Sequence, residues 1–119
     1  MAALTPWLQA SDVRLVNLES ILSDQGGVTV HPQNPLVFSG PPAAAMLLSR
    51  AHIDAVSVAN NHAWDYGKKG LGESLLRLSE AGIATAGASM DRRPYRAATL
   101  RVRDLEIAFL AFTLVWNDG

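Results

Sequence analysis

A short apolar run followed at once by a polar turn dominates this sequence, where Ala55-Val56-Ser57-Val58-Ala59 leads into Asn60-Asn61-His62-Ala63-Trp64-Asp65-Tyr66-Gly67. Consecutive small and β-branched residues predict a strand that is covered on both faces, as the strands of parallel sheets are. The turn then brings two amides, an imidazole and a carboxylate close together in the chain. These groups are typical of a metal site or a phosphate site.

A second polar cluster follows another apolar run, because the run that ends at Val16 leads into Asn17, Leu18 and Glu19. In parallel α/β sheets, right-handed crossovers join the strands, and ligands bind beyond the carboxyl ends. We therefore expect Asn17 and Asn60 at the same edge of one sheet. If the strand direction persists, Asn17 and Glu19 point to one face and Leu18 points into the core, because side chains alternate along a strand.

Length and composition limit the classes of protein to consider. The 119 residues, 49% of them hydrophobic, predict a single domain over 1–119 that buries roughly two-thirds of its unfolded surface. A net charge of −1, with acids and bases scattered singly, disfavours a nucleic-acid interface. Because the chain has no cysteine, any metal must be held by oxygen and imidazole ligands.

No membrane-crossing or secretory segment is expected. No stretch approaches the ~20 apolar residues of a spanning helix. The segment from Met1 to Trp7 lacks the basic start and long apolar core of a secretory signal.

Strand and helix signals alternate along the chain. Apolar spacing predicts strands at 13–16, 55–59 and 83–86, and helices at 4–11, from Pro41-Pro42 to near His52, and at 68–81. Gly82 stands where a left-handed helix cap belongs. The Gly/Pro/Asn-rich segment 23–42 predicts a long loop with short β pieces near 28–30 and 36–38.

The last third of the chain predicts a β-hairpin of residues 97–102 and 106–113 around the turn 103–105. Its second strand is apolar enough to be central in a sheet. A βαβαβ order followed by a hairpin predicts the α/β class, with helices on the faces of the sheet.

Each polar residue also has a purely structural interpretation. Asn17 and Asn60 are equally suited to bonding turn backbone, and Glu19 to being a solvated loop acid. Asp65 is a candidate N-cap for the following helix. His31 and His52 are interpreted as structural, which leaves His62 as the functional histidine. Amide oxygen, carboxylate and imidazole suit a divalent cation such as Mn²⁺, Mg²⁺, Fe²⁺ or Zn²⁺, with a nearby histidine assisting a leaving group.

The two motifs resemble the bacterial poly-γ-glutamate capsule biosynthesis protein family (CapA). The resemblance rests on Asp12 to Ser20, on Val58 to Gly67, and on the Gly70-Leu71 and Ala81-Gly82-Ile83 pairs that follow; it extends from about Leu4 to Thr113. It implies a metallophosphatase-like (calcineurin-like phosphoesterase) α/β sandwich. It also implies a place in capsule assembly at the bacterial cell surface, with capsule-synthesis membrane proteins as partners.

The resemblance assigns roles to individual residues. Asn61 and His62 resemble the Asn-His pair of the phosphoesterase signature, in which the asparagine binds a metal and the histidine faces the phosphate. Glu19 stands near the metal-bridging acid of that family, with Asn17 beside it. His52 stands where family members often have a helix-ending glycine.

The chain also departs from the family pattern. Family members begin with a strand that ends in Gly-Asp, and they continue past the position of Asn117 with strands that carry metal-binding histidines. We therefore expect a truncated domain with about half of the metal ligands. A metal-dependent phosphoesterase is expected only of the full domain, and this chain alone is expected to be inactive.

The leading hypothesis is a capsule-family domain whose ancestral chemistry is metal-dependent phosphoester hydrolysis. It assigns His62 as catalytic, Glu19 and Asn61 as metal ligands, and Asn17, Asn60 and Asp65 as supporting residues. The alternative is a non-catalytic assembly module that binds a polyanion or a partner protein without metal. An apolar sheet edge beside Phe109 and Phe112 predicts self-association.

Overall fold

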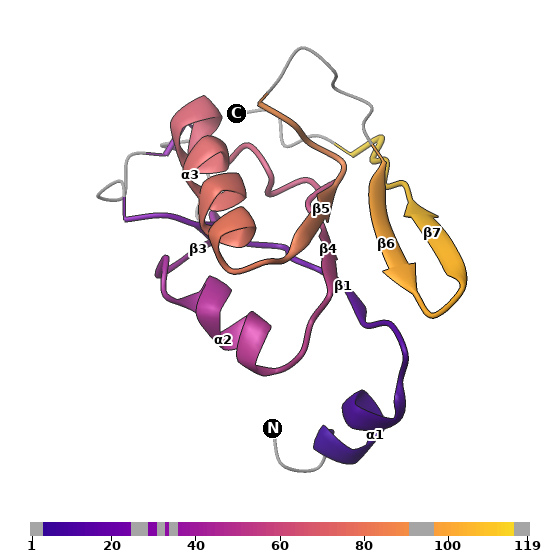
Figure 1. Ribbon diagram of the computed structural model, residues 1–119. Helices are drawn as coiled ribbons and strands as arrows, with labels where there is room; N and C mark the ends of the chain where they lie inside the picture. The colour runs from indigo at the N-terminus through magenta and orange to yellow at the C-terminus, as the bar shows by residue number, and fades with distance from the viewer. Residues whose placement is uncertain (1–3, 25–28, 31–32, 34–35, 91–96, 116–119) are drawn as a thin grey trace.

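The structure, a computed structural model, describes residues 4–24, 29–30, 33, 36–90 and 97–115, and a parallel three-stranded sheet lies at its centre (Figure 1). The strands β1 (Leu15–Asn17), β4 (Ala55–Ser57) and β5 (Ala84–Ala86) lie in the order β1-β4-β5. Asn17 pairs with Ser57, and Ser57 pairs with Ala86, so the three carboxyl ends are level at one edge. The predicted parallel α/β sheet is confirmed. Its strand bounds differ from the prediction, because β4 ends at Ser57 and not at residue 59, and β1 begins at Leu15 and not at residue 13.

The crossover helices α2 (Ala44–Arg50) and α3 (Gly67–Glu80) lie on one side of this sheet in Figure 1. Right-handed crossovers that proceed in one direction along a sheet place their helices on the same face. The core between the layers includes Val56 of β4 and Leu78 of α3, both 0% exposed. Leu71 is buried with Leu78 on the inner face of α3, as the leucine spacing predicts. The first helix, α1 (Thr5–Ala10), has no buried residue.

Both crossover helices end in the same left-handed cap. After α2, His52 has φ 60° and donates to Ser49 O at 2.9 Å, while Ile53 donates to Leu48 O at 3.0 Å. After α3, Gly82 has φ 75° and takes the same position relative to its helix. This pattern is the Schellman motif, in which glycine is favoured at the left-handed residue. The expected glycine cap is confirmed, and His52 adopts the conformation of a helix-ending glycine.

The long connection between β1 and α2 contains two short parallel strands, β2 (Ile21–Leu22) and β3 (Ser39–Gly40). Ile21 and Leu22 are buried, and the Leu22 N–H donates to Ser74 Oγ of α3 at 2.7 Å. The strand piece predicted near 36–38 was misplaced, because β3 begins at Ser39. Of the piece predicted near 28–30, Val28 lies outside the described residues, and Thr29 and Val30 are not in a strand. Strands of two residues are too short to produce a detectable alternation of apolar and polar side chains.

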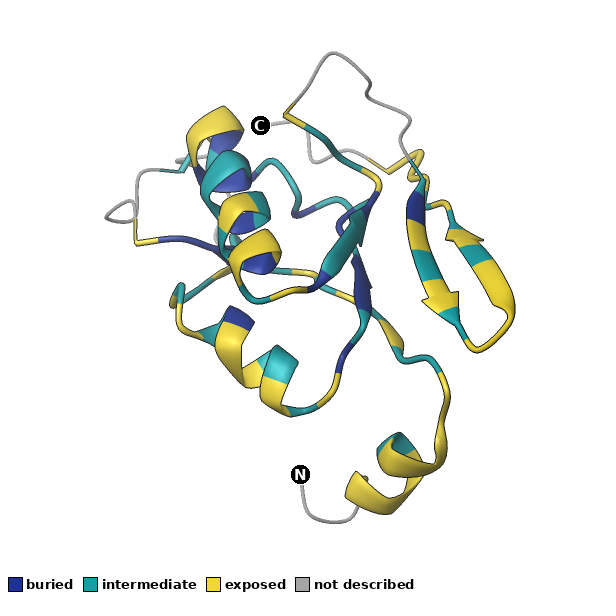
Figure 2. Ribbon diagram, viewed as in Figure 1, coloured by how far each residue is buried: buried dark blue, intermediate teal, exposed yellow. Residues whose placement is uncertain are grey.

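The predicted hairpin is confirmed as β6 (Ala98–Val102) and β7 (Leu105–Phe109), joined at Arg103, which has φ 54°. β6 contacts β5, and the hairpin lies on the side of the sheet away from the helices (Figure 1). The prediction of a central second strand was wrong, because in the described part of the chain β7 pairs with β6 alone. Figure 2 shows its mostly exposed surface. No helix among the described residues is long and apolar enough to span a membrane.

Candidate functional site

The carboxyl ends of β1 and β4 bring the two polar motifs into contact. Asn60 Nδ2 donates to Asn17 Oδ1 at 3.2 Å and to Leu18 O at 2.9 Å. Glu19 Oε2 lies 3.5 Å from Asn17 Nδ2, at the limit of a hydrogen bond. The expectation that the two strand ends meet at one edge is therefore confirmed, and Leu18 packs against the core as expected.

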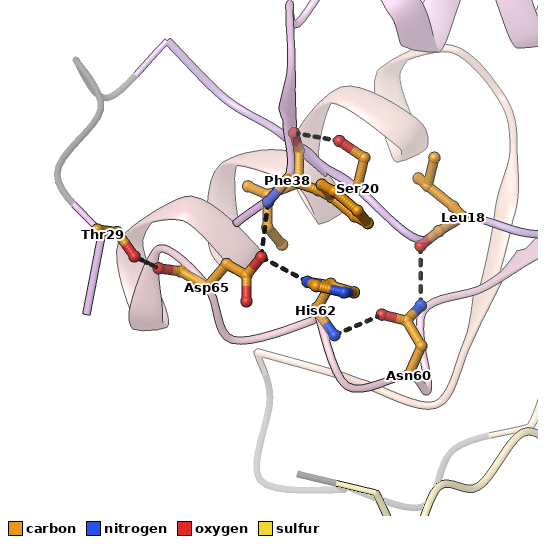
Figure 3. A network of polar contacts seen from close by, with 8 residues as sticks. Leu18, Ser20, Thr29, Phe38, Asn60, His62 and Asp65 are labelled. Carbon is orange, nitrogen blue, oxygen red and sulfur yellow. Dashed lines mark hydrogen bonds and ion pairs between the residues drawn. The ribbon is translucent and has the colours of Figure 1, made fainter. Parts of the chain in front are cut away.

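Asn60 holds the two motifs together. Its Nδ2 donates to Asn17 Oδ1 and to Leu18 O at the end of β1, and its Oδ1 accepts the His62 N–H at 3.1 Å (Figure 3). Because both ends of the amide are used, Asn60 fixes the start of the turn relative to β1. The structural interpretation of this asparagine thus agrees with the geometry, while Asn17 and Glu19 remain exposed at the edge.

The His62 imidazole is turned inward and is only 7% exposed. Its Nδ1 lies 2.8 Å from Asp65 Oδ2, and the Asp65 side chain is fully buried. A carboxylate is an acceptor, so it favours the tautomer with the proton on Nδ1 and leaves Nε2 as the second ring nitrogen. The prediction that Asp65 caps α3 was wrong, because the N-cap is Tyr66 and no side chain bonds the helix end there.

Asp65 also holds the long loop, a role that the sequence did not reveal. Its Oδ2 accepts the Phe38 N–H at 2.7 Å, and its backbone oxygen accepts the Thr29 hydroxyl at 2.7 Å and the Val30 N–H at 2.9 Å. The Phe38 ring stacks on the His62 ring with centroids 4.1 Å apart and planes 30° apart (Figure 3). These residues lie far from Asp65 in sequence, so no local spacing could indicate the contact.

A glycine after β5 sets the position of the same turn. Gly87 has φ 99°, and a Cβ there would lie 2.8 Å from Ala59 N and 2.5 Å from Ala59 Cβ. Only a residue without a side chain allows the end of β5 to approach β4 so closely. The backbone that presents Asn60 and His62 therefore depends on Gly87, which the sequence patterns did not single out.

Two side chains at this edge carry oxygen atoms of the kind that bind a divalent cation. Glu19 offers an exposed carboxylate, and Asn61 is a half-exposed amide beside His62. Hard cations take such oxygen ligands. Among the residues that the structure describes, however, no group of three His, Asp or Glu side chains is arranged to hold a metal ion.

Of the two other histidines, only His52 lies in the described part of the chain. His52 is exposed at the end of α2, in agreement with a structural role. His31 lies outside the described residues.

The chain is similar to one family of known proteins and to two curated relatives. The sequence profile described as "Bacterial capsule synthesis protein PGA_cap" matches residues 1–118. Two curated relatives, from the CDC 1551 and H37Rv strains of Mycobacterium tuberculosis, are each named "Probable polyglutamine synthesis accessory protein". Each is 31% identical over 91 residues, which is 76% of this chain and 23% of the relative. The chain therefore spans about a quarter of the length of these curated relatives.

Proposed function

The chain belongs to the family of bacterial capsule synthesis proteins, and from that premise we propose that it takes part in the assembly of a poly-glutamate capsule polymer. The edge formed by the ends of β1 and β4 is the site through which it acts. Capsule-synthesis membrane proteins are the proposed partners, and the bacterial cell surface is the proposed place of action.

One observation carries this proposal: the hydrogen-bonded chain that links Glu19, Asn17, Asn60, His62 and Asp65. It joins the two motifs that are shared with the family. In parallel sheets the carboxyl edge is where ligands bind.

For the chemistry of the site we propose metal-dependent phosphoester hydrolysis, with Glu19 and Asn61 as two of the oxygen ligands. A divalent cation held there would supply the charge that polarises a phosphoryl oxygen. Mn²⁺, Mg²⁺, Fe²⁺ and Zn²⁺ all suit mixed oxygen and imidazole ligands. The remaining ligands of such a site would come from residues outside the described chain.

The proposed role of His62 follows from its pairing with Asp65. Because Nδ1 is held by Asp65 Oδ2, Nε2 is the ring nitrogen that can hold or release a proton at a leaving oxygen. Asp65 is thus a positioning residue for the proposed catalytic group.

A second candidate function is a non-catalytic module that binds a polyanion or a partner protein. The exposed position of Asn17 and Glu19, where a partner can reach both side chains, favours it. In this function Asn60, His62 and Asp65 maintain the shape of the edge, and Glu19 with Asn17 forms part of the contact surface.

Calorimetric titration with Mn²⁺ separates the two functions. The metal function predicts saturable heat for the native chain and an association constant about tenfold weaker or more for Glu19→Gln and Asn61→Ala, the variants of the two proposed ligands. Glu80→Gln is the matched control, since Glu80 is an exposed carboxylate at the far end of α3 that pairs only with Arg77 among the described residues. Equal, weak heats in all four proteins would discard the metal function for this chain.

A second experiment tests the module function. Retention of the native chain on immobilised poly-γ-glutamate in buffer containing a chelator would support it if retention is weakened in Asn17→Ala and strengthened in Glu19→Gln, which removes a like charge from the edge, but is unchanged in Glu80→Gln. Equal retention of all variants would contradict a contact through this edge.

A further inference from the structure

The stretch from Thr29 to Phe38 approaches the candidate site twice, and both contacts end on Asp65. The first is made at Thr29 and Val30 with the Asp65 backbone oxygen, and the second is made by the Phe38 N–H with Oδ2. Oδ2 is also the atom that holds His62 Nδ1. One carboxylate oxygen therefore fixes both the backbone at Phe38 and the direction of the imidazole.

The Phe38 side chain adds a contact that loop anchoring alone does not require. Its ring lies 4.1 Å from the imidazole, centroid to centroid, yet the residue remains 40% exposed. The Phe38 ring covers one face of the imidazole and so opposes rotation of the imidazole away from Asp65, since a stacked neighbour must move before the ring can turn.

We propose that Phe38 is a positioning residue for His62, holding the imidazole against Asp65 so that Nδ1 carries the proton and Nε2 is presented to the ligand. This inference rests on the proposed role of His62 at the site. Its two observations, the shared oxygen and the stacked ring, are independent of any metal. Without the Phe38 ring, the imidazole gains access to orientations in which Asp65 no longer selects the tautomer.

The contacts at Thr29 and Val30 hold that part of the loop beside the start of α3. Val30 donates to the Asp65 backbone oxygen, and a Cβ at Gly67 would lie 3.0 Å from Val30 Cγ1. The Phe38 N–H is held separately by Asp65 Oδ2.

Nitrogen NMR of the ¹⁵N-histidine-labelled chain tests the proposal, with His62→Gln used to assign the signals. At alkaline pH the native chain should show His62 mainly as the Nδ1–H tautomer. Phe38→Leu should lower the ratio of Nδ1–H to Nε2–H about two- to tenfold, the range that an aromatic pair is worth. Phe38→Tyr, which keeps the ring, should restore the native ratio.

Leu36→Ala is the matched control, because Leu36 is an exposed apolar residue of the same loop. It should leave the tautomer ratio unchanged. Phe38→Met serves as a second variant should Phe38→Leu fail to fold, because a flexible apolar side chain keeps the volume without the ring.

An unchanged ratio in a folded Phe38→Leu or Phe38→Met variant would overturn the proposal. An equal change in Leu36→Ala would also overturn it, because it would show a general loosening of the loop. The readout does not depend on metal binding. A chain that gives no Mn²⁺ heat but keeps the dependence on Phe38 would remove the proposed metal chemistry and retain the positioning role.

Discussion

Replacement of Asp65 tests the arrangement most directly, because one buried oxygen accepts hydrogen bonds from two groups distant in sequence. Oδ2 lies 2.8 Å from His62 Nδ1 and 2.7 Å from Phe38 N. In Asp65→Ala both donors lose their acceptor, and an orphaned buried donor costs about 1–3 kcal/mol. We assign the low end of this energy range to the Phe38 N–H, which is only part-buried, and the high end to His62 Nδ1, which is buried.

We therefore expect Asp65→Ala to lower the free energy of unfolding by about 3 kcal/mol. Part of the gross loss is offset, because Asp65 Oδ1 is buried without a hydrogen-bond partner among the described residues and its desolvation is relieved. Asp65→Asn keeps the shape and one acceptor but loses the charge, which about halves the strength of such bonds. Its expected loss is roughly 1.5 kcal/mol.

Equilibrium unfolding in urea measures both losses as shifts of the midpoint at unchanged slope. Asp54→Asn is the matched control, because Asp54 Oδ2 also accepts a backbone N–H, from Arg14 at 2.8 Å, but its side chain is 36% exposed. Exposed pairs of this kind contribute at most about 1 kcal/mol. The reasoning fails if Asp65→Ala unfolds with the native midpoint, or if Asp54→Asn loses more stability than Asp65→Asn.

Three further outcomes follow from the backbone and the sheet edge. Gly82→Ala should lower the free energy of unfolding by about 1 kcal/mol, because the left-handed backbone disfavours alanine while the added Cβ meets open space. Gly87→Ala should lower it by at least about 2 kcal/mol, because the added Cβ also collides with Ala59. Equal midpoints in urea for the two variants would contradict this. His52→Gly should raise the free energy of unfolding by about 0.5 kcal/mol, since relief of the left-handed strain exceeds the added chain entropy, and a lower melting temperature would refute it. The native chain should self-associate at micromolar concentration in sedimentation experiments, and Ala108→Lys should shift it towards monomer, because a lysine on an edge strand opposes pairing; a monodisperse native monomer would be the contrary result.

Periodic and β-branched patterns were enough to predict the parallel sheet, both crossover helices and the hairpin. Each of these elements carries a strong local signal, such as the leucine spacing of α3 or the apolar run of β4. The meeting of Asn17 and Asn60 could be predicted as well, because parallel strands joined by a right-handed crossover end at one edge. The resemblance to the capsule family rested on the same two motifs, and the family is confirmed.

The details of the site could not be predicted, because they depend on contacts between distant segments. Asp65 has the sequence context of a helix cap, but the loop brings the Phe38 N–H to the same side chain, and its oxygen bonds that group and His62 instead. β7 has the composition of a central strand, yet the described chain offers it no second neighbour.

The sequence by itself determined which strand ends carry amides, carboxylates and an imidazole, because periodicity and chain direction place those residues at one edge. Only the tertiary structure decided which of them are used internally. Burial removes water as a hydrogen-bond partner, so His62 and Asp65 bond each other and Asp65 bonds the loop, while half-buried Asn60 bonds Leu18 O and the His62 N–H. Glu19 and Asn17 remain at the surface, where solvent satisfies them and a ligand can reach them.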